Sequence, residues 1–323
     1  MATLSQQPIR LRTDVPGVDA EISHLIEQLR QERIDGVRDY LARTRASGDW
    51  QDRLYVLGQI AAHAPAYVLN AACEAEPEAA DVFVLRCAYF AELSITMRGT
   101  GTANQVKAAN MRSSAAAVQA AMASMAKSTQ LDGQDPTAYA LVLRPLSIFG
   151  QAELQKRAFD RATAIAPGLV AAHLALTTAH SERWGGSHNA SLQFARLAMT
   201  KAGPGSDMAA CLFWAHDLVR THFMHFNKDV PGSLRYAADS GVTGELNSAL
   251  EAWLAPPYVA RRSSTPFLRR ASAWYRAVSD ADRFKRIAAL TGEEFKEADF
   301  SAARQFAGAK RGGLLGWIYG SSH

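Results

Sequence analysis

A helix–turn–helix pattern that begins at Pro136 limits what the chain can fold into more than any other feature. Over a unit of about 34 residues, apolar or small side chains fall where two packed helices meet, and helix breakers fall where helices must end. The positions in order are Tyr139, Val142, Leu146, Gly150 at the turn, Phe159, Ala162 and the closing Pro167. Apolar residues three or four apart share one helix face, so this spacing predicts two antiparallel helices over residues 136–167.

Similar but less regular units flank this one. A second unit starts near Val170 and turns at Trp184–Gly186, an upstream pair covers residues 81–99 and 113–132, and a downstream unit begins at residues 210–226. No alternating Val/Ile/Thr run marks a strand. The helix–turn–helix spacing of these units is the tetratricopeptide (TPR) pattern. It predicts an all-α fold: a TPR-like α-solenoid of antiparallel helix pairs with no significant β-sheet. Pro145, inside the first helix of the Pro136 unit, should kink or interrupt that helix.

Composition and charge divide the chain into three parts. We expect a flexible N-terminal lead-in over residues 1–16, a TPR-like repeat domain over residues 17–258, and a basic helical extension over residues 259–323 that packs on the solenoid or caps it. The extension holds 12 Lys/Arg against 6 Asp/Glu. Its tail, residues 312–323, is apolar and glycine-rich, and it is either a cap for the last helices or a recognition peptide for a partner.

Arginines and aromatic residues are interleaved in the extension between Arg261 and Arg286. Such a stretch either follows a nucleic-acid backbone with base stacking or forms an amphipathic helix whose arginines reach outward. The apolar residues concerned are Phe267, Leu268, Ala271, Trp274 and Tyr275. Their spacing fits about 3.6 residues per turn, so the amphipathic helix is favoured and a nucleic-acid partner is not expected.

Cysteine usage and hydropathy indicate a reduced, cytoplasmic protein. Cys73, Cys87 and Cys211 are few, widely spaced and set among apolar residues, which is typical of small core residues. No apolar run reaches the roughly 18–20 residues that span a bilayer, and the first residues lack the apolar core of a secretory signal. Phosphate-binding loops and nucleophile elbows are also absent from the sequence, so no cofactor is predicted.

Several short motifs lie between Asp81 and Asn227. They are Leu85–Arg86, Arg98–Gly99, Leu-Asp-x-x-Asp-Pro at 131–136, Trp-Gly-Gly-Ser-His at 184–188 and Phe-Ala-Arg at 194–196. Together they resemble a bacterial helical-repeat domain that is common in actinobacteria and has no assigned activity, and the likeness extends weakly to residues 48–61. Members usually continue the Trp-Gly-Gly-Ser-His motif with acidic residues, whereas this chain has Asn189 and Ala190. The resemblance implies a TPR-like fold and leaves the function open.

The first helices of stacked units line the inner surface of a solenoid of this kind. At inward positions of the two central units we expect a mixed groove formed by Arg144, Ser147, Thr178, Ser181 and Glu182. Such a groove suits a peptide or a helix. The sequence therefore favours a non-catalytic interaction scaffold with a protein or peptide partner.

Six of the nine histidines lie between His173 and His225, which leaves a second hypothesis open. Histidine is a common metal ligand and general base, and His222 and His225 are three residues apart, so one metal ion could contact both. With His180 and His216 they are the candidate ligands of a metal-dependent enzyme or small-molecule binder. No His-Glu-x-x-His string supports this alternative, and His173 and His180 occupy positions that face neighbouring helices.

The string from Trp184 to His188 is either a ligand-binding loop or a turn between helices. We interpret it as a turn, because Gly185 and Gly186 fall where a first helix must end and reverse. Ser187 then suits the N-cap of the next helix, and Trp184 should pack as an apolar wedge across the helix pair. His188 has no evident catalytic partner within the string.

Overall fold

Helices dominate residues 18–99 and 106–292, which are the part of the chain that the computed structural model describes. Fifteen α-helices and four short 3-10 helices occur in this part, and no β-strand does, which confirms the predicted all-α fold. The predicted lead-in and the tail at 312–323 lie outside the described residues. The α-helices are α1 (Val18–Arg30), α2 (Asp35–Ser47), α3 (Trp50–Ile60), α4 (Ala66–Ala75), α5 (Ala80–Arg98), α6 (Ala108–Leu131), α7 (Thr137–Ile148), α8 (Ala152–Ile165), α9 (Val170–Ala179), α10 (His188–Ala202), α11 (Ala210–His225), α12 (Val230–Ala238), α13 (Ser240–Trp253), α14 (Thr265–Ala277) and α15 (Ala281–Thr291). The 3-10 helices are η1 (Ala61–His63), η3 (Glu182–Trp184), η4 (Asp207–Ala209) and η5 (Arg262–Ser264).

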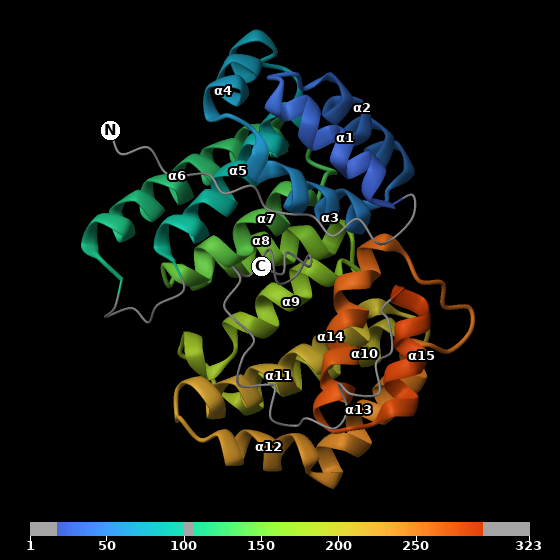
Figure 1. Ribbon diagram of the computed structural model, residues 1–323. Coiled ribbons are helices and arrows are strands. Elements are labelled where there is room, and N and C mark those ends of the chain that lie inside the picture. Colours follow the sequence, from blue (N-terminus) through green and yellow to red (C-terminus); the bar gives the residue numbers. More distant parts are fainter. Residues whose placement is uncertain (1–17, 100–105, 293–323) are drawn as a thin grey trace.

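Four consecutive helix pairs, α5–α6, α7–α8, α9–α10 and α11–α12, form the solenoid. The first helices α5, α7, α9 and α11 pack on one another in chain order, and each also packs on the second helix of its own pair. Each of the second helices α6, α8 and α10 in turn contacts the first helix that follows it. Figure 1 shows this succession running from α5 in the upper half of the view, through α9, to α12 at the bottom. The units predicted at Pro136 and Val170 are therefore confirmed as α7–α8 and α9–α10.

The spacing of apolar residues determines which face of each helix is buried. In α1, Ile22, Leu25, Ile26 and Leu29 follow one another at three- and four-residue steps, and each is at most 3% exposed. Side chains at these steps lie on one side of a helix. Small residues occupy the positions where a second helix crosses its neighbours. Ala162 of α8, for example, has no exposed surface.

Pro145 lies inside α7, and the helix continues through it to Ile148. The expected interruption does not occur. Proline removes one backbone donor, but only three helical residues follow it, so the loss falls on the last turn. There the carbonyl of Leu146 accepts hydrogen bonds from the backbone N–H groups of Phe149 and Gln151, which close the helix end.

Arg53 of α3 ties the N-terminal helices to the repeat stack. Its side chain is fully buried, and Nη2 donates to Asp81 Oδ1 at 2.6 Å and to Asp135 Oδ2 at 2.9 Å. Nε donates to Thr137 Oγ1 at 3.1 Å, and Nη1 donates to the carbonyl of Leu41. The acceptors belong to α2, α5, α7 and the turn before α7, so one guanidinium joins several elements. A buried charge is stable only when its partners satisfy it in this way.

The C-terminal helices return to the N-terminal end of the stack. Helix α14 packs on α11 and α15, while η5 packs on α3. In η5, Arg262 donates to both carboxylate oxygens of Asp52 and, at 2.8 Å, to Glu21 of α1. Figure 1 shows this orange segment reaching the blue helix α3. Elements from the two ends of the described chain are therefore held together by charge-assisted hydrogen bonds.

Arginines of the basic extension pair with acids of this chain. Arg270 donates to Asp217 and lies over the ring of Trp214, 4.2 Å from its centroid, and Arg286 pairs with Glu251 at 2.7 Å. The predicted amphipathic helix is confirmed as α14, whose buried residues include Phe267, Leu268, Ala271, Trp274 and Tyr275. Several of the positive charges that a nucleic-acid backbone would need are thus already paired with acids of this chain.

Replacing Arg53 with Met should lower the free energy of unfolding by about 3–5 kcal/mol, because Asp135 would keep a buried charge without its cation and Asp81 would keep only its longer contact with Arg45. Arg53→Lys should recover part of the loss, since an ammonium keeps the charge but lacks the fork of donors. Urea unfolding followed by circular dichroism measures the change, with Arg157→Met on the exposed face of α8 as the control. An Arg53→Met protein as stable as the parent would contradict the role given to this network.

Candidate functional site

The turn between α9 and α10 is closed by its own backbone. The N–H of Gly186 donates to the carbonyl of Ser181 at 3.1 Å, and the N–H of Ser187 donates to the carbonyl of His180 at 2.9 Å. Ser187 is the N-cap of α10, as predicted, and its Oγ accepts from the N–H of Ala190 at 3.1 Å. Gly185 adopts a left-handed conformation with φ of 87°. The string beginning at Trp184 is therefore a tightly bonded turn.

Two positively charged side chains lie close to the indole ring of Trp184. The guanidinium of Arg98, at the end of α5, and that of Arg183 each lie 5.5 Å from the centroid of its ring. Arg183 also lies 5.6 Å from the ring centroid of Phe226, just after α11. The sequence predicted an apolar wedge, whereas the structure gives the indole ring two cationic neighbours, an arrangement that is favourable because the face of an aromatic ring is negative.

Arg144 of α7 completes what we call the arginine cluster: Arg98, Arg144 and Arg183 with Trp184. Burial lowers the pKa of Arg144 to about 9; Glu92 opposes this shift, while Arg183 and Arg98 add to it. Burial also raises the pKa of the Glu92 carboxyl. Among the described residues, Arg144 Nη1 and Glu92 Oε2 are buried without a hydrogen-bond partner. The cluster thus brings three cations together, and burial disfavours the charge of Arg144 most.

The hydroxyl groups predicted to line the groove form hydrogen bonds within the helix stack. Thr178 and Ser181 are 5% and 3% exposed. Thr178 Oγ1 donates to the carbonyl of Leu174 and accepts from the indole N–H of Trp214, while Ser181 Oγ donates to the carbonyl of Thr178. Ser147 Oγ likewise donates to a carbonyl of its own helix α7. Of the predicted groove residues, Glu182 is exposed and Arg144 is partly buried.

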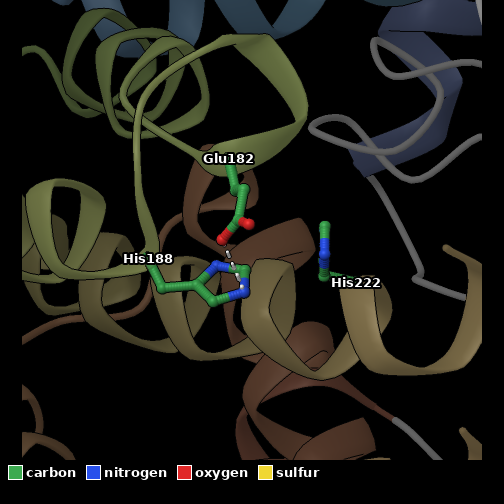
Figure 2. A group of neighbouring side chains, drawn as sticks. All are labelled: Glu182, His188 and His222. Atoms are coloured by element: carbon green, nitrogen blue, oxygen red, sulfur yellow. Dashed lines mark ion pairs between the residues drawn. The ribbon is translucent and has the colours of Figure 1, made fainter. Parts of the chain in front are cut away.

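A second group of polar side chains adjoins the arginine cluster. Glu182, His188 and His222 each offer one ligand atom, and these atoms lie within 4.8 Å of one another. His188 Nε2 is 3.2 Å from Glu182 Oε2, and the two imidazole rings meet edge to face with centroids 4.8 Å apart. Figure 2 shows Glu182 directed at the ring of His188, with the ring of His222 beside them. His222 stacks on Phe226, the same ring that Arg183 contacts.

Charge at His188 is controlled by its surroundings. Burial lowers the pKa of its imidazole, Glu182 raises it, and the neighbouring His222 lowers it. The net direction is downward, so the ring is neutral at neutral pH. Neutral imidazole is the form that can bind a metal ion or accept a proton.

The predicted set His180, His216, His222 and His225 is not brought together. Among the described residues, the group with metal-ligand spacing contains only His222 from this set and joins it to Glu182 and His188. His180 packs on Phe194, with ring centroids 5.2 Å apart. His216 is 2% exposed and is bonded to Tyr236 and Glu245. The spacing in sequence could not reveal this, because His188 and His222 meet only through the packing of α10 on α11.

A polar depression of about 400 Å³ lies elsewhere, between α2, the start of α5 and the end of α6. Its lining includes Arg45, which pairs with Asp81 at 3.4 Å and with Asp132 at 3.6 Å. Arg38, also in the lining, pairs with Glu76 at 2.9 Å. Both arginines of this depression are therefore paired with acids of the chain.

Comparisons with known proteins do not assign the chain to a family. No protein-family model matches the chain, and no curated protein matches it. Among solved structures, a monomeric mutant of IFIT1 with Gppp-AAAA is similar, with a TM-score of 0.37 and 11% sequence identity. The match covers 88% of this chain and 58% of that one, so the chain spans less than two thirds of its length. The assignment to all-α helical-repeat proteins therefore rests on the packed helix pairs themselves.

None of the described helices combines the length and hydropathy that a bilayer span requires. Sequence reasoning identified Arg144, Glu182 and the turn but not the side chains that surround them. Arg98 was noted only as part of a short motif, and Arg183, Glu92 and Phe226 were missed.

Gly186→Val should lower Tm by about 5–10 °C, because a Cβ on Gly186 would overlap the backbone carbonyl of His180. The matched control is Gly168→Ala in the turn before α9, where a Cβ would meet nothing within 4 Å. Differential scanning calorimetry measures both. A Gly186→Val protein with unchanged Tm would overturn the structural interpretation of the turn.

Proposed function

We propose that the chain is a non-catalytic helical-repeat scaffold that binds an acidic segment of a partner protein along the face of its first helices. The observation that carries this proposal is the arginine cluster. Arg144 lies near Arg98 and Arg183, burial opposes its charge, and its Nη1 is buried without a hydrogen-bond partner among the described residues. A bound anion would offset that penalty through charge-assisted hydrogen bonds. The cluster therefore suits a ligand that brings carboxylates.

The distribution of the cations supports an elongated ligand. Arg98 comes from α5, Arg144 from α7 and Arg183 from η3, directly after α9. Since α5, α7 and α9 stack in chain order, the cations follow the direction of stacking. Separate carboxylates along a peptide match such a row better than one compact anion does, and each guanidinium can bind a carboxylate through two parallel hydrogen bonds. Trp184 adds an aromatic surface for an apolar side chain of the same segment.

Two further predictions from the sequence, the family and the cellular compartment of the chain, belong to this proposal. Arg98 and Trp184 lie within motifs that resemble a bacterial helical-repeat family, and we propose that the chain is a member of that family. The buried thiols of Cys87 and Cys211 are unbridged, and burial raises the pKa of each to about 12. Buried, unreactive thiols support a reducing compartment, which we propose is the cytoplasm.

Fluorescence anisotropy with a labelled octapeptide of alternating Glu and Asp tests the proposal. Arg144→Met removes one cation while keeping the aliphatic volume, and it should weaken binding by about tenfold at low salt. Arg157→Met on the exposed face of α8 is the matched control and should change the affinity by less than about twofold. Circular dichroism verifies that both variants keep the helical fold.

A second peptide separates specific binding from general attraction. The isosteric octapeptide of alternating Gln and Asn should not bind, because it lacks the carboxylates. If Arg144→Met and Arg157→Met weaken the acidic peptide equally, or if the parent protein binds neither peptide, the assignment of the arginine cluster fails.

A further inference from the structure

We propose that Glu182, His188 and His222 form a binding site for one divalent transition-metal ion, with Zn²⁺ as the ion that matches the donor set best. The three residues come from η3, the first turn of α10 and the last turn of α11, and Figure 2 shows them gathered around one point. The site is separate from the acidic-segment proposal, which depends on the arginine cluster.

The distances are close to those that zinc requires. Zinc binds imidazole nitrogen and carboxylate oxygen at about 2.0–2.2 Å, so ligand atoms of a tetrahedral site lie about 3.3 Å apart. His188 Nε2 and Glu182 Oε2 are already 3.2 Å apart. Since the ligand atoms of all three residues lie within 4.8 Å of one another, a small rotation of the His222 or Glu182 side chain suffices to close the site.

The contact between Glu182 and His188 accounts for only two of the three residues. Glu182 and His188 are within ion-pair distance, but the His222 ring lies against His188 without a carboxylate partner of its own in the structure as described. In the His222 ring, Nδ1 is buried and lacks a hydrogen-bond partner within the described residues. A buried polar atom without a partner is unfavourable. A metal ion bound by Nε2 of His188 and by the imidazole of His222 would give the His222 ring a bonded partner.

The turn holds two ligands in place before any ion binds. Glu182 lies within the segment closed by the hydrogen bonds from Gly186 to Ser181 and from Ser187 to His180, and His188 follows it directly. Ser187 also fixes the start of α10, where His188 stands. His222 is supported by stacking on Phe226. Ligands held on rigid elements lose little conformational freedom on binding, which favours affinity.

The donor types restrict which ion fits. Two imidazoles and one carboxylate suit zinc and its neighbours in the first transition series, whereas Mg²⁺ and Ca²⁺ prefer oxygen donors alone. Three protein ligands leave a fourth position of a tetrahedral ion for water or for a donor atom of a bound molecule. The bound ion would also add positive charge beside Arg183, which shares the ring of Phe226 with His222.

Isothermal titration of the metal-free, untagged full chain with ZnCl₂ tests the site. We expect one ion per chain, and about tenfold or greater weakening in both His188→Ala and His222→Ala. Glu182→Gln keeps the size of an exposed side chain and should also weaken binding, so it carries the test if either histidine variant fails to fold. His180→Ala is the matched control, because His180 packs on Phe194 outside the group, and its affinity should equal that of the parent.

Cobalt provides a second readout. Co²⁺ in the parent protein should give the intense visible absorption of a four-coordinate ion, and ZnCl₂ should displace it. Absence of saturable Zn²⁺ binding by the parent would overturn the proposal, as would equal binding by the parent, His222→Ala and Glu182→Gln. Neither result affects the acidic-segment proposal, because the titration contains metal ions and no peptide.

Discussion

The guanidinium of Arg53 is fully buried, and its charge is stable only because the surrounding helices supply hydrogen-bond acceptors. Asp81 and Asp135, which accept its hydrogen bonds, belong to α5 and to the turn that opens α7. The arginine therefore fixes the N-terminal helices against the first two repeat units. This network also joins α5 to the start of α7. It therefore supports the stacking of α5 on α7, which brings Arg98 and Arg144 into one region.

Arginine plays two physical roles in this chain, and the difference between them supports the site that we propose. Arg53 and Arg262 are surrounded by acceptors from the protein itself, so their charges stabilise the fold. Arg144 is partly buried near a single acid, Glu92, and one of its terminal nitrogens has no hydrogen-bond partner among the described residues. A fold rarely keeps an unsatisfied buried charge without a reason, and ligand binding is a reason that accounts for the position of this one.

Much of the fold could be predicted because its rules are local. Tyr139, Val142 and Leu146 lie on one helix face, and Ser187 follows two glycines, so the helix pair and the turn can be derived from spacing alone. The site could not be derived in this way. Arg98, Arg144 and Arg183 are separated by tens of residues, and nothing in their separation indicates that α5, α7 and η3 bring them close together. His188 and His222 meet for the same reason, through the packing of α10 on α11.

The pairing of Arg262 with Asp52 and Glu21 joins positions more than 200 residues apart. Repeat units can assemble from neighbouring contacts as the chain is synthesised, but this pairing has to wait until η5 has left the ribosome. Until then the two acids have only the partners that α2 supplies, Tyr40 for Asp52 and Arg43 for Glu21. The order in which these contacts can form therefore follows the chain: the stack forms from local contacts, and η5 later adds its charge-assisted hydrogen bonds to the first helices.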